Sequence, residues 1–190
     1  MNTIKKVTFT RNNVNCTIST GDAFSKNDLE NLKRYYENWK ALNEENKHFN
    51  MRRANLPELL SEGLASALFG WIRTNATSIS GCQSSSCDLV DTKTGELIQL
   101  KACSTTAHSP AGPTSFGPKT EFDTLIFMHL DCEKNTASFY KLDATVYKSW
   151  MVNSFETIAD QQAQGRRPRV VILDKIKKDN LQPFYVHYFE

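Results

Sequence analysis

Residues 87 to 104 read CDLVDTKTGELIQLKACS, and this stretch predicts a β-hairpin with polar side chains on its second arm. The runs CDLVD and ELIQLKAC flank the turn-forming tetrapeptide TKTG, in which Gly95 suits a positive φ angle. In the second run apolar residues alternate with Gln99 and Lys101, as the geometry of a strand requires. The hairpin therefore presents an amide and an amine on one side of a largely apolar strand.

The register of this hairpin decides which side chains meet. If Asp91 and Glu96 close the loop, Asp88 lies directly across from Gln99. Cross-strand neighbours on one face have Cβ atoms about 4.5–5.5 Å apart. An acid, an amide and the amine of Lys101 would then converge, although a one-residue bulge would change the pairing.

Size and composition are those of an ordinary globular protein. The 190 residues predict a single domain, with residues 1–50 as an N-terminal hairpin and helix added to it. The first residues lack the apolar segment of a secretion signal, and no apolar run is long enough to span a membrane. The odd set of five cysteines in such a chain predicts reduced thiols and a cytoplasmic location.

The net charge of +2 is small, but its distribution is uneven. Residues 97–120 contain no acid, and residues 166–178 contain six basic side chains and one acid. Two such segments are compatible with a positive surface that faces a polyanion. On charge alone, a solvated basic surface fits equally well.

The remaining patterns predict alternating helices and strands. They indicate hairpins over 5–20 and 123–144, helices over 25–46, 55–72 and 145–164, a loop over 102–120, and strands from Val170 and over 181–189. Asp28 is placed for a capping box with Ser25, and Glu58 for one with Asn55. This order predicts an α/β (mixed α+β) fold with a central mixed sheet flanked by helices.

The polar residues of the hairpin suit phosphodiester hydrolysis. Asp88 and an amide or carboxylate oxygen can hold Mg²⁺, which prefers oxygen ligands. Lys101 can orient or help to deprotonate a water molecule and can offset negative charge at the phosphate. The spacing D-x10-Q-x-K is weak by itself, since many hairpins carry an aspartate and a lysine by chance.

The run SSSCDLVDTKTGELIQLKACS, residues 84–104, resembles the active-site hairpin of PD-(D/E)xK nucleases, a superfamily that contains many type II restriction endonucleases. SFGPKTEFDTLIFMHLD and QGRRPRVVILDKI resemble segments of a family of small restriction enzymes that cut GC-N-GC sites. The resemblance covers roughly residues 55–176. It implies a restriction-endonuclease-like core and leaves the N-terminal hairpin and the first helix outside.

By position, the resemblance implies that Asp88 is the metal-binding aspartate and that Lys101 is the lysine of the motif. Gln99 stands where the second acid usually stands, and Glu62 matches a helix glutamate that often supplements such sites. Asp88, Gln99 and Glu62 would then hold Mg²⁺. Two residues depart from the pattern, since Cys87 replaces the usual proline and the Gln99 amide binds Mg²⁺ more weakly than a carboxylate.

The helix glutamates also have structural interpretations. Glu62 lies opposite the predicted buried face of its helix, so a solvated side chain is natural there. Glu58 is a rival for the site, but its capping-box position gives it a structural role.

The loop after the catalytic strand and the GRRPR run are the best candidates to contact DNA. Serine, threonine and lysine can bind phosphates, and arginine can hold phosphates or form bidentate bonds to guanine. The candidate residues are Ser104, Thr105, His108, Ser115, Lys119, Arg166, Arg167 and Arg169. A palindromic target implies a two-fold homodimer, whose interface the N-terminal hairpin and first helix would supply.

The resemblance thus predicts a Mg²⁺-dependent type II restriction endonuclease, functionally linked to a methyltransferase that protects host DNA. A structure-specific repair nuclease of the same fold and an inactive DNA-binding module are the alternatives. A zinc site built from Cys82, Cys87, Cys103 and His108 is a weaker hypothesis, because the spacings are not the usual tight pairs.

Overall fold

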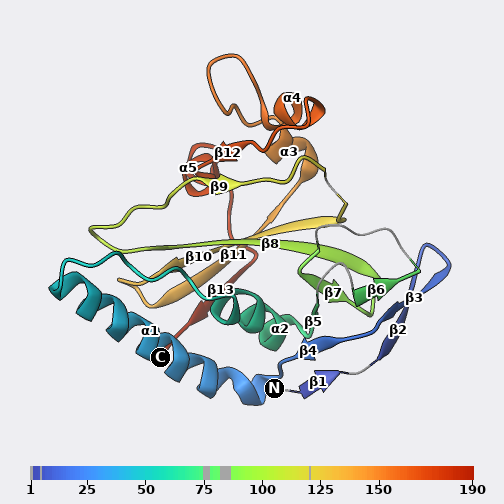
Figure 1. The fold of residues 1–190 in the computed structure, drawn as a ribbon, viewed down its shortest axis with the longest axis horizontal. Coiled ribbons are helices and arrows are strands. Elements are labelled where there is room, and N and C mark those ends of the chain that lie inside the picture. Colours follow the sequence, from blue (N-terminus) through green and yellow to red (C-terminus); the bar gives the residue numbers. More distant parts are fainter. Residues whose placement is uncertain (1, 5, 75–77, 82–86, 120) are drawn as a thin grey trace. The chain divides into compact units, whose positions relative to one another are not determined.

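The structure is a computed structural model that describes residues 2–4, 6–74, 78–81, 87–119 and 121–190. The chain divides into two compact units, which are described separately (Figure 1). Unit 1 comprises Met1–Cys82 and Asp88–Gly95, and unit 2 comprises Gln83–Cys87 and Glu96–Glu190.

A three-stranded antiparallel sheet in unit 1 begins with the predicted N-terminal hairpin. Strands β2 (Val7–Arg11) and β3 (Val14–Ile18) pair through the turn residues Asn12 and Asn13, which both have positive φ angles. Two such residues are typical of a type I′ turn, whose twist matches that of the flanking strands. Strand β6 (Ile79–Ser80) pairs with β3.

A second set of antiparallel strands in unit 1 carries the residues that matter for function. In spatial order these strands are β1 (Asn2–Ile4), β4 (Gly21–Ala23), β5 (Ile72–Arg73) and β7 (Leu89–Asp91). The register pairs Arg73 of β5 with Asp22 of β4 on one side and with Leu89 of β7 on the other. Arg73 therefore lies in the middle of these strands.

Helix α1 (Leu29–His48) confirms the predicted first helix. It follows a 3-10 turn, η1 (Lys26–Asp28), in which the Ser25 backbone N–H donates to the Asp28 carboxylate at 2.9 Å, as the capping box predicts. Leu32, Tyr36 and Trp39 are buried on one face of α1. Among the described residues, no helix is long and apolar enough to cross a membrane.

The second helix begins later than the sequence indicates. A π-helical turn, η2 (Leu59–Gly63), is followed by α2 (Leu64–Phe69), so the expected N-cap at Asn55 is wrong. Instead, the Asn55 carbonyl accepts a hydrogen bond from the Trp39 indole at 3.0 Å, which holds this segment against α1. The capping role expected for Glu58 is also wrong, because its carboxylate binds Arg73.

Unit 2 is built on a mixed four-stranded sheet, which confirms the predicted fold class. In spatial order its strands are β8 (Glu96–Thr105), β10 (Thr124–Asp131), β11 (Thr136–Leu142) and β13 (Tyr185–Tyr188) (Figure 1). Strands β8 and β10 are parallel, and the other two pairs are antiparallel. A core that includes Phe127, Tyr147, Ile158 and Ile176 packs helices of this unit onto the sheet.

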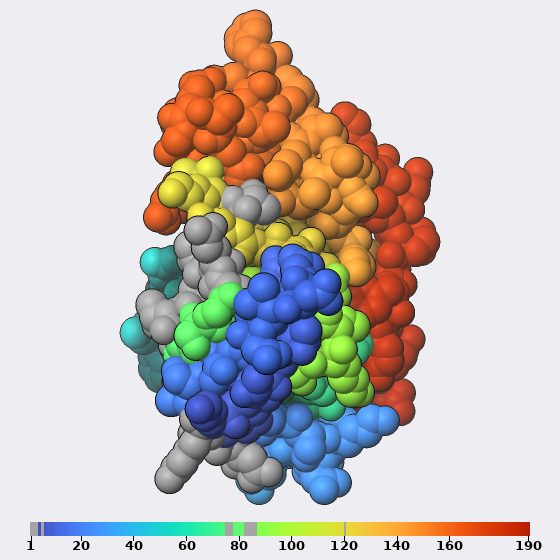
Figure 2. All heavy atoms as spheres, turned by 90° about the vertical axis from the view of Figure 1, so that its right-hand side faces the viewer, coloured from blue at the N-terminus to red at the C-terminus, as the bar shows by residue number. Residues whose placement is uncertain are grey.

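The expected helix over 145–164 is wrong. The segment forms two short helices, α3 (Ala144–Lys148) and α4 (Ile158–Ala163), joined by a loop over 149–157 that projects at one end of unit 2 (Figures 1 and 2). Thr157 is the N-cap of α4 and accepts a hydrogen bond from the Asp160 backbone N–H at 3.1 Å. This local capping box begins a new helix where a continuous one was predicted.

The strand predicted from Val170 is mostly helical. Only β12 (Arg169–Val170) is extended, and α5 (Ile172–Lys178) follows it. The β-branched run VVIL favours a strand, but Ile172, Leu173 and Ile176 are buried at helical spacing against the core of unit 2.

The predicted loop over 102–120 is shorter and more ordered than expected. Strand β8 extends to Thr105, and β9 (Thr114–Ser115) pairs with β12. The register places Ser115 directly opposite Arg169. The two segments that carry the family resemblance in unit 2, SFGPK and GRRPR, therefore lie side by side.

Candidate active site

The predicted catalytic residues are divided between the two units. Glu62 in η2 and Asp88 immediately before β7 belong to unit 1, and Gln99 and Lys101 lie on β8 in unit 2. The Asp88 carbonyl accepts a hydrogen bond from the Thr74 backbone N–H at 3.0 Å. This bond fixes the backbone of Asp88 beside the end of β5.

One guanidinium gathers three carboxylates in unit 1. Arg73 donates from Nε to Glu62 Oε2 at 2.6 Å and from a terminal nitrogen to Glu58 Oε2 at 2.7 Å. A third contact, to Asp22 Oδ2, measures 3.6 Å. The Glu62 side chain is 15% exposed and that of Glu58 is 74% exposed, so Glu62 is the inner acid and Glu58 the outer one.

The pKa of the Glu62 carboxyl is raised above its ordinary value. Burial, which disfavours the charged form, and to a lesser extent the negative charge of Asp88 raise the pKa of Glu62 to about 7. The hydrogen bond from Arg73 opposes this rise. Glu62 and Asp88 are therefore close enough to repel each other, as two acids do when they share a binding site.

The partly buried position of Glu62 differs from the solvated one that the helical wheel allows. The wheel assumes a regular α-helix, whereas residues 59–63 form a π turn, which changes the direction of the side chains that follow. Such turns are frequent at functional sites.

On β8, the polar residues are buried to different degrees. Gln99 is 6% exposed and pairs with Leu125 of β10, and Lys101 is half-buried and pairs with Phe127. Burying a neutral amide costs less free energy than burying a carboxylate, because only the carboxylate carries a charge. This difference is a physical reason for glutamine at a position where an acid is usual.

The turn between β7 and β8 agrees with the sequence-based prediction. Gly95 has a φ of 77°, and its N–H donates to the Asp91 carbonyl at 2.8 Å. The Asp91 side chain accepts from the Lys93 backbone N–H at 2.9 Å, which closes the turn. Glu96, after the turn, pairs with Lys141 at 3.3 Å.

The pairing of β9 with β12 unites two groups of candidate DNA-contacting residues. Besides the pairing of Ser115 with Arg169, the Phe116 N–H donates to the Pro168 carbonyl at 2.9 Å. Gln162 of α4 donates to the Gly117 carbonyl at 2.7 Å. The strand pair and these bonds form a ribbon that we call the β9–β12 ribbon, residues 114–117 and 167–170.

The three arginines of the GRRPR run have different surroundings. All three are exposed, and Arg166 also forms an ion pair with Glu156. Hydrogen bonds from Asn153, Gln161 and Arg166 lower the pKa of Glu156 to about 2. Arg166 therefore has a structural contact within unit 2.

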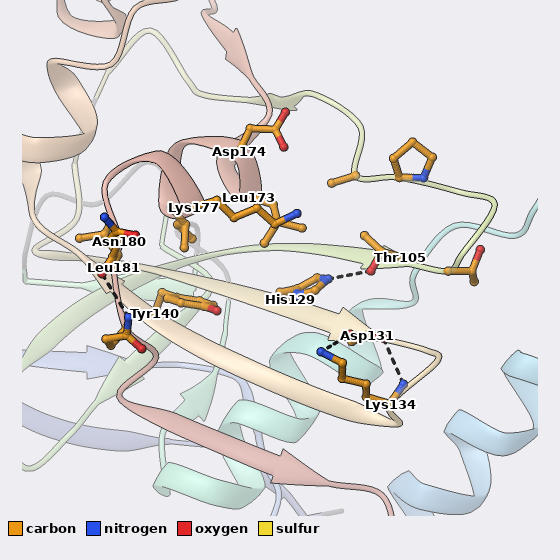
Figure 3. A pocket seen from close by; sticks show the side chains of 15 residues that line it. Thr105, His129, Asp131, Lys134, Tyr140, Leu173, Asp174, Lys177, Asn180 and Leu181 are labelled. Atoms are coloured by element: carbon orange, nitrogen blue, oxygen red, sulfur yellow. Dashed lines mark hydrogen bonds and ion pairs between the residues drawn. The ribbon is translucent and has the colours of Figure 1, made fainter.

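Another candidate residue, Thr105, lines a pocket of about 650 Å³ in unit 2 (Figure 3). Thr105 Oγ1 lies 2.7 Å from His129 Nε2, so this hydroxyl faces the pocket (Figure 3). Burial lowers the pKa of His129, which keeps the imidazole neutral. Ser104 precedes Thr105 on β8 and is half-buried.

The last two candidates and the zinc hypothesis concern the segment after β8. His108 and Lys119 are exposed. Cys87 is buried and Cys103 is half-buried, and Cys82 lies outside the described residues. Within the described ranges, no three side chains of His, Cys, Asp or Glu are grouped so that they could bind a metal ion.

Arg73, which organises the acids of unit 1, was not predicted from the sequence. Its signal is faint, because a single arginine in the short run WIRT is not unusual. Its partners Asp22 and Glu58 are 51 and 15 residues away in the chain, so no local pattern connects them.

Comparison with known proteins gives two findings. Residues 24–179 match the model of a family described as the Bsp6I restriction endonuclease. The type II restriction enzyme Bsp6I from Bacillus sp. (strain RFL6) is 33% identical over 157 residues, which cover 82% of this chain and 84% of that enzyme. The family match includes α1, which the sequence analysis placed outside the resemblance. No solved structure matches this chain.

Proposed function

This chain belongs to the Bsp6I restriction endonuclease family, and from this premise we propose how it cleaves DNA and where. Family membership makes it a type II site-specific deoxyribonuclease. We propose Mg²⁺-dependent hydrolysis of double-stranded DNA at a short GC-rich palindrome such as GCNGC. The observation that carries the function is the match to a type II restriction enzyme over most of both chains.

We propose that Asp88, Glu62 and Gln99 hold the Mg²⁺ ion. Their oxygens are the ligands that this hard cation prefers. The repulsion between the Glu62 and Asp88 carboxylates supports the proposal, because a divalent cation bound between two carboxylates offsets this repulsion. When bound, the ion supplies a water of lowered pKa and offsets the developing charge on the phosphate.

The protein side chains then divide the remaining tasks. Lys101 orients the attacking water and offsets negative charge on the scissile phosphate. Because Gln99 carries no charge, neutralisation of the cation depends on Asp88 and Glu62. Arg73 is a positioning residue in this scheme, since it fixes the Glu62 carboxylate by the bond from Nε.

For DNA binding we propose the eight residues of the sequence analysis, with distinct roles. The exposed Arg167 and Arg169 contact phosphates or guanines, and Arg166 supports the ribbon through Glu156. Ser115 on β9, with His108 and Lys119 in the adjoining loops, adds contacts to the backbone. Ser104 and Thr105, at the end of β8, add hydroxyl groups that can bind phosphates.

A digest of unmethylated phage DNA tests the proposed function. With Mg²⁺, the purified protein is expected to give discrete fragments, whose ends identify the recognition sequence. A smear, or cleavage of branched DNA alone, would favour a structure-specific repair nuclease. Salt-sensitive binding without any cleavage in Mg²⁺ or Mn²⁺ would instead indicate an inactive DNA-binding module.

We also propose a homodimer in which each subunit cuts one strand of the palindrome. Tyr35 and Leu42 of α1 and the C-cap residue Phe49 support an interface on this helix, because they are exposed and lie seven residues apart, along one line. The pairing of this line with that of a second copy would bury all three side chains.

The change Leu42→Glu is therefore expected to convert a dimer into a monomer in sedimentation velocity at micromolar concentration. A charge at the centre of an apolar contact has no partner when the contact closes. The control is Ala41→Glu, which adds the same charge to the neighbouring exposed position, away from the line. A dimer that tolerates Leu42→Glu, or a monomeric wild type, contradicts the proposed interface.

Three smaller proposals complete this function. The chain forms one nuclease domain and works in the cytoplasm. A DNA methyltransferase that is functionally linked to the enzyme protects the same sites on host DNA. The odd number of cysteines, five, supports the location, since thiols persist in a reducing compartment.

A further inference from the structure

The loop over 149–157 exposes a large aromatic side chain to solvent. Phe155 is 90% exposed, more than any other large apolar residue among those the structure describes. The loop itself projects from unit 2 between α3 and α4 (Figure 2). An aromatic ring that is held in water forgoes the free energy of burial, which a binding partner that covers the ring would recover.

The backbone on both sides of Phe155 is firmly held. Asn153 Oδ1 accepts hydrogen bonds from the N–H groups of Phe155 and Glu156, both at 2.9 Å. The Val152 N–H donates to the Glu156 carbonyl at 2.8 Å, and Met151 forms an isolated β-bridge with Thr157. These bonds preform the tip of the loop, so little conformational entropy remains to be lost on binding.

The same loop is attached to the basic run. The Glu156 carboxylate accepts hydrogen bonds from Gln161 of α4 at 3.0 Å and from Gln164 at 3.3 Å, and it forms the ion pair with Arg166. Arg166 is the first arginine of the GRRPR run that continues into the β9–β12 ribbon. Phe155 therefore directly precedes Glu156, whose carboxylate connects the loop to Arg166.

This arrangement fits DNA better than a protein surface. The residues beside Phe155 are polar, namely Asn153, Ser154 and Glu156, so the ring is not part of a broad apolar patch of the kind that protein interfaces use. An exposed aromatic ring in a loop that is tied through Glu156 to an arginine-rich run matches a nucleic acid, which offers a base face for the ring and phosphates for the cations.

We propose that Phe155 is a preformed wedge that stacks on a base, or between two base pairs, of the bound DNA. This inference rests on the proposed function and adds an affinity-determining residue to it. Stacking of the ring contributes no phosphate contact, so the wedge strengthens binding without changing its dependence on salt. Insertion of an apolar side chain also unstacks a base step and bends the duplex.

The test compares DNA binding by Phe155→Ala, Phe155→Trp and the wild type. The probe is a duplex that carries the site mapped from wild-type cleavage, and fluorescence anisotropy without metal ion is recorded over a series of salt concentrations. Phe155→Ala is expected to bind roughly tenfold more weakly with an unchanged salt slope, and Phe155→Trp to restore the affinity. A circular-permutation gel assay should show a smaller DNA bend for Phe155→Ala.

Two further variants make the result specific. Tyr188→Ala removes another exposed aromatic ring of unit 2 and is expected to bind DNA as the wild type does. Arg167→Ala is expected to weaken binding and to reduce the salt slope by about one, which is the signature of a lost phosphate contact. Because Phe155 is exposed, its replacement should leave the melting temperature unchanged.

Wild-type affinity and bending in Phe155→Ala would overturn the wedge. A change in dimerisation with unchanged DNA affinity would also overturn it and would assign the ring to a second copy of the chain. If the wild type itself neither cuts nor binds DNA, the proposed function fails. If the wild type cuts DNA and Phe155→Ala binds normally, this inference alone fails.

Discussion

Replacement of Asp88 by alanine is expected to slow DNA cleavage by roughly 10³-fold or more while DNA binding without metal ion stays within about twofold of the wild type. Asp88 is the ligand that the proposed site shares most directly with other nucleases of this type, and alanine removes both of its oxygens. Single-turnover cleavage in Mg²⁺ measures the first effect, and anisotropy of a labelled duplex measures the second.

A second acid near the same turn provides the matched control. Asp91 closes the turn through the Lys93 backbone N–H and lies outside the proposed metal site. Asp91→Ala should therefore cut at nearly the wild-type rate, and Lys101→Ala should resemble Asp88→Ala. Equal losses in Asp88→Ala and Asp91→Ala would mean that the hairpin fold, and not the metal site, is affected.

Replacement of Arg73 by methionine is expected to lower the free energy of unfolding by about 2–3 kcal/mol at pH 8. Methionine keeps much of the volume of the side chain but leaves the partly buried Glu62 without its guanidinium partner. Glu62 then faces the charge of Asp88 without compensation. Urea denaturation between pH 5.5 and pH 8.5 measures the loss.

The cost of Arg73→Met should decrease as the pH falls. In the folded wild type the pKa of Glu62 is about 7, against an ordinary value of 4.5, so the folded state binds a proton more tightly than the unfolded chain. The contribution of Glu62 to stability is therefore greatest below pH 4.5 and declines as the pH rises to about 7. Since Arg73 lowers the pKa of Glu62, the change Arg73→Met raises that pKa. The decline in stability then extends to higher pH.

Two comparisons identify the cause. Arg166→Met also breaks an ion pair, but a more exposed one, and Glu156 stays ionised above pH 5.5 because its pKa is about 2. Its cost should therefore be small and independent of pH in this range. Adding Glu62→Gln to Arg73→Met should recover stability at pH 8. An Arg73→Met cost that is the same at pH 5.5 and pH 8.5 would refute the assignment to Glu62.

Local patterns made several parts of the fold predictable. The turn of the first hairpin needs positive φ angles, and Asn12 and Asn13 tolerate them. Gly95 has the same role in the turn before β8. Ser25 and Asp28 mark the start of the first helix through side-chain bonds to adjacent backbone groups. In each case the deciding interaction spans only a few residues.

Where distant contacts decide, the sequence-based predictions were wrong. The extended residues before η2 are held by Trp39 of α1, which no motif near Asn55 reveals. The run after Val170 resembles a strand until its residues pack as a helix on the core of unit 2. Tertiary packing overrides local propensity in both places.

In the candidate site, too, features set by local sequence were predictable, and features set by contacts between distant residues were not. Asp88 could be proposed as a site residue from the hairpin and from family resemblance, and Glu62 from resemblance, but the burial of Glu62 depends on a π turn that no sequence motif indicates. The bond between Glu62 and Arg73 requires β5 to lie beside η2. The catalytic roles of Gln99 and Lys101 remain predictions for the cleavage experiments.

The pairing of β9 with β12 has a consequence for newly made enzyme. Translation delivers Ser115 long before Arg169, so the ribbon cannot assemble on the ribosome until residue 170 has left the exit tunnel. A nascent chain that already contains Asp88 and Lys101 still lacks β12 and the arginines that are proposed to contact DNA. Truncated chains that end before this point lack it permanently, so prematurely terminated products pose little danger to the chromosome of the cell that makes them.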